Sequence, residues 1–198
     1  NITLDRTVDD AQAIFESLNS TGKELSESDL IRNYILMGLE NNEQSYVYEH
    51  FWRPMELMFE YEKQDSVMDK FFRDYLTMKL TRIPKIDKVY EEFKLYHVNC
   101  EFSSVRDLCE DLLKYAKYYT DMVFARSSNP VIKNLYVDVN DLRMEVAFPF
   151  LLKVHNDCSE GLITEENFIE ILKMCISYVF RRNICDIPTN SLNKTFAT

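Results

Sequence analysis

The sequence predicts an all-α protein, an irregular multi-helix bundle of about seven to nine helices. Its 198 residues include only three Gly and five Pro, whereas an all-β chain needs many tight turns and these two residue types supply their dihedral angles. The chain is 46% hydrophobic and 13% aromatic, which is enough to form a core and excludes a disordered chain. The one exception to helix that the pattern allows is a short strand at the N-terminus, over residues 2–4.

The first helix is predicted over residues 7–18. Thr7 and Asp10 form a capping signature. The apolar side chains that follow keep the three- and four-residue spacing of one helix face: Ala11, Ile14, Phe15 and Leu18. Residues 19–22 break this helix at Gly22, which suits a left-handed turn position. A second capping signature, Ser26 with Asp29, predicts a helix that continues to Leu39.

The middle of the chain carries most of its aromatic residues. Residues 44–61 include Pro54, which should either start a helix or kink one. Residues 66–81 are apolar around more than one side, which predicts a helix covered by several neighbours. A shorter helix is expected over residues 87–97. Residues 104–125 show the cleanest amphipathic pattern, with Ser104 as the cap.

The C-terminal third is predicted to contain two helices. Asn129 and Pro130 are interpreted as the end of the preceding region. Residues 141–155 are predicted to form a helix interrupted by Pro149, and residues 165–183 are predicted to form a long apolar helix. The tail, residues 186–198, is polar and loosely patterned.

The charge and the cysteines limit the class of protein. With 33 acidic and 23 basic side chains, the net charge is −10, which argues against a surface built for nucleic acid. The densest basic stretch, residues 79–88, is interpreted as a solvated helix end, with a phosphate contact as the alternative. The five cysteines form no C-x-x-C pair, which favours a reduced, cytoplasmic compartment. No apolar run is long enough to span a membrane, and no signal-peptide pattern precedes the first helix.

No local motif for chemistry is present. The three histidines, His50, His97 and His155, lack the spacing of a metal site on one helix. Residues 156–164 resemble a calcium loop through Gly161, but Cys158 occupies a position that requires a hard oxygen ligand, and Asn167 stands where the loop needs a bidentate Glu. We therefore predict a turn followed by a helix capped at Thr164. No catalytic residue, metal site or cofactor is assigned to this chain.

One stretch resembles a known family. Residues 10–33, DAQAIFESLNSTGKELSESDLIRN, resemble the end of the N-terminal domain of GmrSD-type, modification-dependent restriction endonucleases, which typically reads F-E-x-L-N-x-x-G-x-x-L-x-x-x-D-L-I-x-N. The tail around Arg181, Arg182 and Asn183 resembles the junction before that family's nuclease domain. The chain contains neither the family's D-G-Q-Q-R motif nor an HNH-type metal site.

The resemblance implies a division of the chain into three parts. Residues 1–40 would end a ParB/sulfiredoxin-like domain, residues 41–185 would form a helical connector, and residues 186–198 would begin a linker. The parent protein would use NTP and a divalent metal, outside this chain, and would act on DNA in phage defence. Because the chain opens at Asn1 and ends in a polar segment, we expect it to be a piece of such a protein, whose flanking domains are its partners.

Two weak sets of site residues follow. The resemblance would place Asn19 and Gly22 near the parent's nucleotide or DNA pocket, although a helix–turn–helix junction fixed by packing explains them as well. The nucleic-acid candidates are basic: Arg82, Lys85, Arg181 and Arg182.

Three hypotheses remain for function. The first is a non-catalytic helical region that couples the two active domains of an endonuclease. The second is a stand-alone protein-interaction module that binds a partner through residues 44–61. The third is a helical domain that contacts DNA through residues 79–88 and Arg181 with Arg182.

Overall fold

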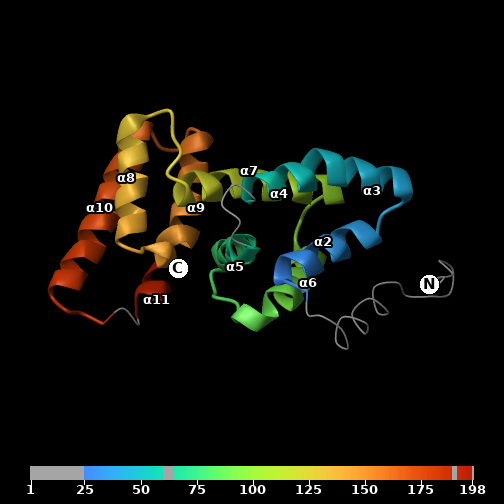
Figure 1. Cartoon of the computed structure of the whole chain (residues 1–198), viewed down its shortest axis with the longest axis horizontal. Helices are drawn as coiled ribbons and strands as arrows, with labels where there is room; N and C mark the ends of the chain where they lie inside the picture. Colours follow the sequence, from blue (N-terminus) through green and yellow to red (C-terminus); the bar gives the residue numbers. More distant parts are fainter. Residues whose placement is uncertain (1–24, 60–64, 189–190, 198) are drawn as a thin grey trace.

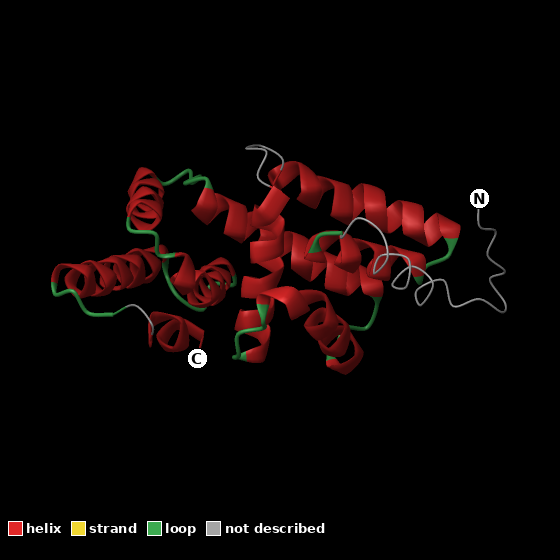
Figure 2. Ribbon diagram, turned by 60° about the horizontal axis from the view of Figure 1, so that its bottom comes forward, coloured by secondary structure: helices red, strands yellow, loops and turns green. Residues whose placement is uncertain are grey.

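The computed structural model describes residues 25–59, 65–188 and 191–197, and in this part of the chain it contains helices and no strand (Figures 1 and 2). The all-α prediction is therefore confirmed for these residues. The expected strand at residues 2–4 and helix at residues 7–18 lie outside them. The α-helices are α2 (Glu27–Met37), α3 (Asn41–Val47), α4 (Arg53–Phe59), α5 (Asp65–Leu80), α6 (Val89–Asn99), α7 (Val105–Val123), α8 (Pro130–Asp141), α9 (Phe148–Ser159), α10 (Glu165–Ile184) and α11 (Leu192–Ala197). One π-helical turn, η1 (Tyr48–Trp52), and two 3-10 turns, η3 (Ile86–Lys88) and η4 (Glu145–Ala147), join them.

Helix α5 lies at the centre of the bundle. Figure 1 shows it end-on, with α2, α3, α4 and α6 on one side and α8, α9, α10 and α11 on the other. It packs against α2, α4, α6, α7 and α9, and α7 runs from one group of helices to the other. The expectation that residues 66–81 are covered on more than one side is thus confirmed.

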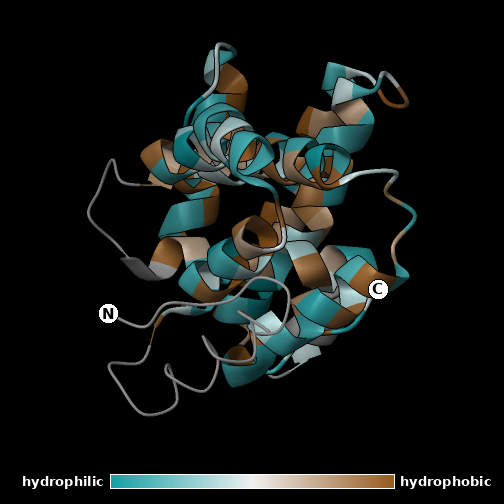
Figure 3. Cartoon of the chain, turned by 90° about the vertical axis from the view of Figure 1, so that its right-hand side faces the viewer, coloured by the Kyte–Doolittle hydropathy of each residue, from teal (hydrophilic) through white to brown (hydrophobic). Residues whose placement is uncertain are grey.

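The core around α5 is rich in aromatic rings. Phe71, Phe72 and Tyr75 of α5 are fully buried. Phe72 stacks on Trp52 with ring centroids 5.9 Å apart, and Phe71 contacts Tyr119 of α7 at 5.5 Å. Aromatic pairs of this kind stabilise a core beyond the burial of their area. Figure 3 shows apolar and polar residues alternating along the helices, as is typical of helices with one buried face.

Helices α3 and α4 form one continuous run through the π-helical turn. The N–H of Arg53 bonds the carbonyl of Tyr48, five residues back rather than four. The next residue, Pro54, has no N–H to donate, so the change of register falls where a backbone bond is missing anyway. The prediction for Pro54 is confirmed, because it lies in the first turn of α4 after this irregularity.

Three predicted helix caps are confirmed. The hydroxyl of Ser26 accepts a hydrogen bond from the N–H of Asp29 at 3.1 Å, and that of Ser104 from the N–H of Asp107 at 3.2 Å. Thr164 forms a capping box with Asn167 at the start of α10. The calcium-like segment is divided between the last turn of α9 and a short turn in which Gly161 has φ of +71°.

The structure corrects two predictions near the prolines. Asn129 and Pro130 begin a helix instead of ending one, because the Asn129 side chain accepts a bond from the N–H of Val131 at 2.8 Å and proline fits the first helical position. A single helix over residues 141–155 is also wrong. Helix α8 ends at Asp141, and α9 begins at Phe148, with Pro149 in its first turn.

The tail is more ordered than its polar composition indicates. Leu192 and Phe196 of α11 are 2% and 8% exposed. The Phe196 ring lies 6.0 Å from Phe150 of α9 and 6.3 Å from Tyr178 of α10. Phe196 therefore packs this short helix against α9 and α10.

We expect Phe71→Ala to lower the free energy of unfolding by about 3–5 kcal/mol, because the deletion leaves a cavity at the centre of the core. Phe180→Ala on α10, where the ring is 49% exposed, is the matched control and should cost less than about 1 kcal/mol. Urea titration followed by circular dichroism measures both. Equal losses for the two variants would contradict the central place of Phe71.

Candidate functional site

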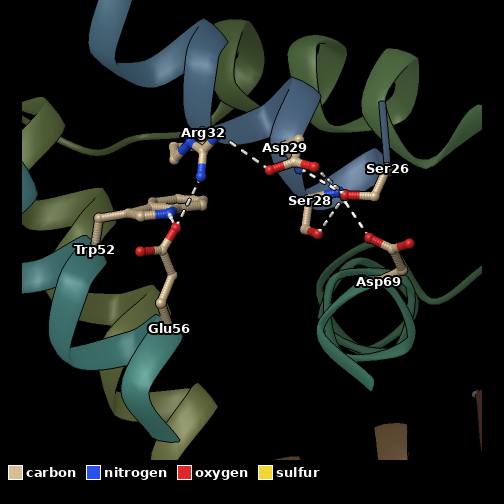
Figure 4. A network of polar contacts seen from close by, with 7 residues as sticks. All are labelled: Ser26, Ser28, Asp29, Arg32, Trp52, Glu56 and Asp69. Atoms are coloured by element: carbon tan, nitrogen blue, oxygen red, sulfur yellow. Dashed lines mark hydrogen bonds and ion pairs between the residues drawn. The ribbon is translucent and has the colours of Figure 1, made fainter. Parts of the chain in front are cut away.

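The residues that resemble the family motif continue into α2, and a polar network holds this helix on its neighbours (Figure 4). Arg32 pairs with Asp29 at 3.1 Å and with Glu56 of α4 at 3.0 Å. The same oxygen of Glu56 accepts a hydrogen bond from the Trp52 indole at 2.9 Å. Because Trp52 is 1% exposed, the network ties α2 to the aromatic core.

The first turn of α2 is held by two capping contacts with neighbouring helices, one to α5 and one to α6. The N–H of Ser28 donates to Asp69 of α5 at 2.8 Å. The Glu27 carboxylate in turn accepts from the N–H of Tyr90 at the start of α6, at 2.5 Å. Each carboxylate thus meets the positive end of another helix, a stabilising arrangement. Together these contacts fix α2 to both α5 and α6.

A cavity of about 380 Å³ lies next to these contacts of α2. Its wall combines charged side chains with an apolar surface and is formed by α2, α5, the η3 region, the start of α6, η4 and α9. The lining residues are Glu27, Asp69, Lys70, Arg73, Asp74, Thr77, Ile83, Ile86, Val89, Glu145, Val146 and Pro149. Lys70 pairs with Glu145 at 3.0 Å, and Nε of Arg73 donates to the carbonyl of Pro84 at 3.1 Å.

Asp74 is the most perturbed acid of this wall. Burial raises the pKa of its carboxyl group from 3.8 to about 7, against the opposing effects of Arg73 and of a hydrogen bond from the Tyr119 hydroxyl. That hydroxyl donates to Asp74 at 3.3 Å. Burial also raises the pKa of Glu27, opposed by its bond from Tyr90. The cavity wall therefore contains one carboxyl group, that of Asp74, whose pKa lies near neutral pH.

The basic candidates for nucleic-acid contact lie in two separate places. Arg82 and Lys85 precede η3, whereas Arg181 and Arg182 lie at the end of α10 (Figure 1). Both guanidinium nitrogens of Arg82 contact the Glu92 carboxylate, one at 2.9 Å. Arg182 donates to the carbonyl of Pro188 at 2.5 Å and to the hydroxyl of Ser191 at 3.2 Å. Lys85 and Arg181 are exposed.

Two of the four basic candidates thus have structural partners. The ion pair to Glu92 occupies Arg82, and Arg182 holds the start of the tail against α10. Lys79, from the same basic stretch as Arg82, pairs with Asp111 at 2.8 Å and lies 4.8 Å from the Tyr115 ring centroid. The structure does not bring the four candidates together. The other two candidates, Asn19 and Gly22, lie outside the described residues.

The histidines take part in aromatic packing. His155 stacks on Tyr118 with ring centroids 4.1 Å apart, and burial lowers its pKa to about 4. His50 stacks on Tyr46, and His97 contacts the Tyr34 hydroxyl at 3.1 Å. Among the described residues, no group of His, Cys, Asp and Glu side chains has the arrangement of a metal site. In the same part of the chain, no helix has the length and apolar character needed to cross a bilayer.

The sequence alone did not identify the residues that hold α2 in place or that line the cavity. Asp29 and Arg32 lie three residues apart on one helix, a spacing that predicts an ion pair. Glu56 and Asp69 come close to this segment only in the folded chain. Asp74 lies between Phe72 and Tyr75 in a helix that is apolar on several sides. An acid in such a position indicates a buried carboxylate, and this signal was not used.

Comparison of the chain with family models, with curated proteins and with solved structures found no match.

We expect Arg32→Met to lower the free energy of unfolding by about 0.5–1.5 kcal/mol, because Asp29 and Glu56 lose their shared cation. Lys133→Met on α8, an exposed lysine, removes the same charge and should change stability by less than about 0.5 kcal/mol. Thermal or urea unfolding provides the comparison. A variant at Arg32 as stable as the control would show that the network does not hold α2.

Asp74→Asn should stabilise the protein at alkaline pH. Since the folded pKa is raised, the contribution of Asp74 to stability is fully present below pH 3.8 and is lost as pH rises through about 7. The amide cannot ionise, so the Tm of the variant relative to the wild type should rise between pH 5 and pH 8, by about 2–4 °C for each kcal/mol. Calorimetry at several pH values tests this. A Tm difference that is constant with pH would refute it.

Proposed function

We propose that this chain is the non-catalytic helical region of a multidomain, NTP-dependent and modification-dependent DNA endonuclease of phage defence, and that it couples the nucleotide-hydrolysing domain to the nuclease domain. The observation that carries the proposal is the attachment of α2. The segment that resembles the GmrSD-type family runs into this helix, and Ser28, Arg32 and Glu27 bind it to α5, α4 and α6.

The packing supports a mechanical role. A displacement of the chain before α2 would act directly on α5, because Asp69 of α5 holds the first turn of α2 at 2.8 Å. Helix α5 packs along α9, and α9 contacts α11 near the end of the chain. Contiguous packed elements of this kind can carry a coupling free energy between distant sites.

The alternative is a stand-alone helical module that binds a protein partner and has no role with nucleic acid. The sequence suggested residues 44–61 as its surface. In that segment Trp52, Met55 and Phe59 belong to the core, whereas Tyr46 and Leu57 are 37% and 55% exposed. These two exposed apolar side chains are the observation that favours this alternative.

The gene on either side of the chain distinguishes the two functions. The coupling function requires a D-G-Q-Q-R motif upstream and an HNH-type region downstream in one reading frame. A start codon directly before Asn1, with no such regions, would refute it and favour the interaction module.

With such a parent protein in hand, activity assays test the coupling itself. The present chain alone, incubated with GTP, divalent metal and modified DNA, should show no turnover. In the full protein, Arg32→Met should leave NTP hydrolysis in place and reduce nucleotide-dependent DNA cleavage at least several-fold, while Lys133→Met changes neither. Robust cleavage by the chain alone, or unaffected cleavage by the Arg32 variant, would contradict the proposal.

A further inference from the structure

We propose that the cavity beside α5 binds a small organic cation, an alkylammonium or guanidinium compound with a short apolar body. The proposal does not depend on the function proposed above, because it concerns a binding site within this chain. It rests on the size of the cavity, on its excess of acidic groups, on an incompletely bonded carboxylate and on its apolar wall.

The cavity has the size of a ligand site. At about 380 Å³ it falls within the range of roughly 300–1,000 Å³ that small-molecule pockets occupy. Most of its charged wall comes from consecutive turns of α5, which other helices hold on several sides. The charged groups are therefore preorganised, which favours tight binding.

The charges of the wall favour a cation. Four acids, Glu27, Asp69, Asp74 and Glu145, face two bases, Lys70 and Arg73. Glu145 pairs with Lys70 at 3.0 Å, so three acids remain against one guanidinium group. When all of these groups are ionised, the wall carries an excess of two negative charges, which would raise the local concentration of cations.

Asp74 is partly buried in this wall, and its carboxylate has few partners. Within the described residues, the Tyr119 hydroxyl is its hydrogen-bond donor, at 3.3 Å, and no lysine or arginine pairs with it. Tyr119 itself is 1% exposed and rigidly packed. An ionised carboxylate can accept several hydrogen bonds, and burying one without compensation is costly. An ammonium or guanidinium group in the cavity would supply the missing donors and the opposite charge.

The rest of the wall fits an organic body. Ile83, Val89 and Pro149 line the cavity, and Ile86 and Val146 are 71% and 38% exposed at its rim. Apolar side chains beside acidic groups suit a molecule with a charged end and a hydrocarbon body. They do not suit a bare metal ion, which needs a shell of oxygen ligands.

Calorimetric titration of the whole chain at pH 8 and about 0.15 M salt tests the proposal, because Asp74 is ionised there and weak surface attraction is screened. The probes are butylamine, 1,4-diaminobutane and butylguanidine, with 1-butanol and butyrate as the neutral and anionic counterparts. We expect the cations to bind with Kd below about 1 mM and the counterparts to bind at least tenfold more weakly. Equal binding of 1-butanol, or no binding of any cation, would overturn the proposal.

Two variants locate the site. Asp74→Asn should weaken cation binding at least tenfold, whereas Asp138→Asn on α8, an exposed acid, removes the same charge and should leave binding unchanged. Val146→Trp fills the rim without changing any charge and should also weaken binding. Circular dichroism confirms that each variant is folded. An equal loss for the variants at Asp74 and Asp138 would assign the binding to the general negative charge and refute the cavity site.

Discussion

The burial of α5 on several sides is the constraint from which the other features follow. Phe71, Phe72, Tyr75 and Leu76 are all inaccessible to solvent, so helices must cover α5 in more than one direction. Several polar residues of the same helix are then partly enclosed between elements, where a hydrogen-bond partner in the fold stabilises them. Asp69 accepts a hydrogen bond from the first turn of α2. In the part of the chain that the structure describes, Asp74 accepts a hydrogen bond from the hydroxyl of Tyr119, and a cavity lies beside it.

The features that could be predicted from the sequence are those set by near neighbours. The caps at Ser26, Ser104 and Thr164 depend on residues three positions away, and a short pattern identifies them. The start of α8 was missed although its signal is equally local, because Asn followed by Pro either ends one element or begins the next. The helical spacing of Ile132, Leu135, Tyr136 and Val139 would have decided between the two.

The site was less predictable because its contacts join distant parts of the chain. Arg32 and Glu56 are 24 residues apart, and Tyr119 lies 45 residues beyond Asp74. No periodicity in the sequence specifies which acid meets which donor. The basic residues show the same limit. The clustering of basic residues in the sequence suggested Arg82 and Arg182 as nucleic-acid contacts. In the fold, Arg82 pairs with the Glu92 carboxylate and Arg182 binds the carbonyl of Pro188 in the tail.

The π-helical turn has a consequence for how this chain can change. A π-helical turn contains one more residue than an α-helical turn would need. Deleting one residue within Tyr48–Trp52 would convert this wide turn into an ordinary α-helical turn and leave α3 and α4 nearly in phase, because the wide turn accommodates its extra residue locally. Val47, now fully buried, would stay in the core, and Arg106 would keep its ion pair with Glu43. A deletion in the regular part of α3, in contrast, would rotate the residues before it by about 100°, so the π-helical turn is the place in this run where the chain can lose a residue at least cost to packing.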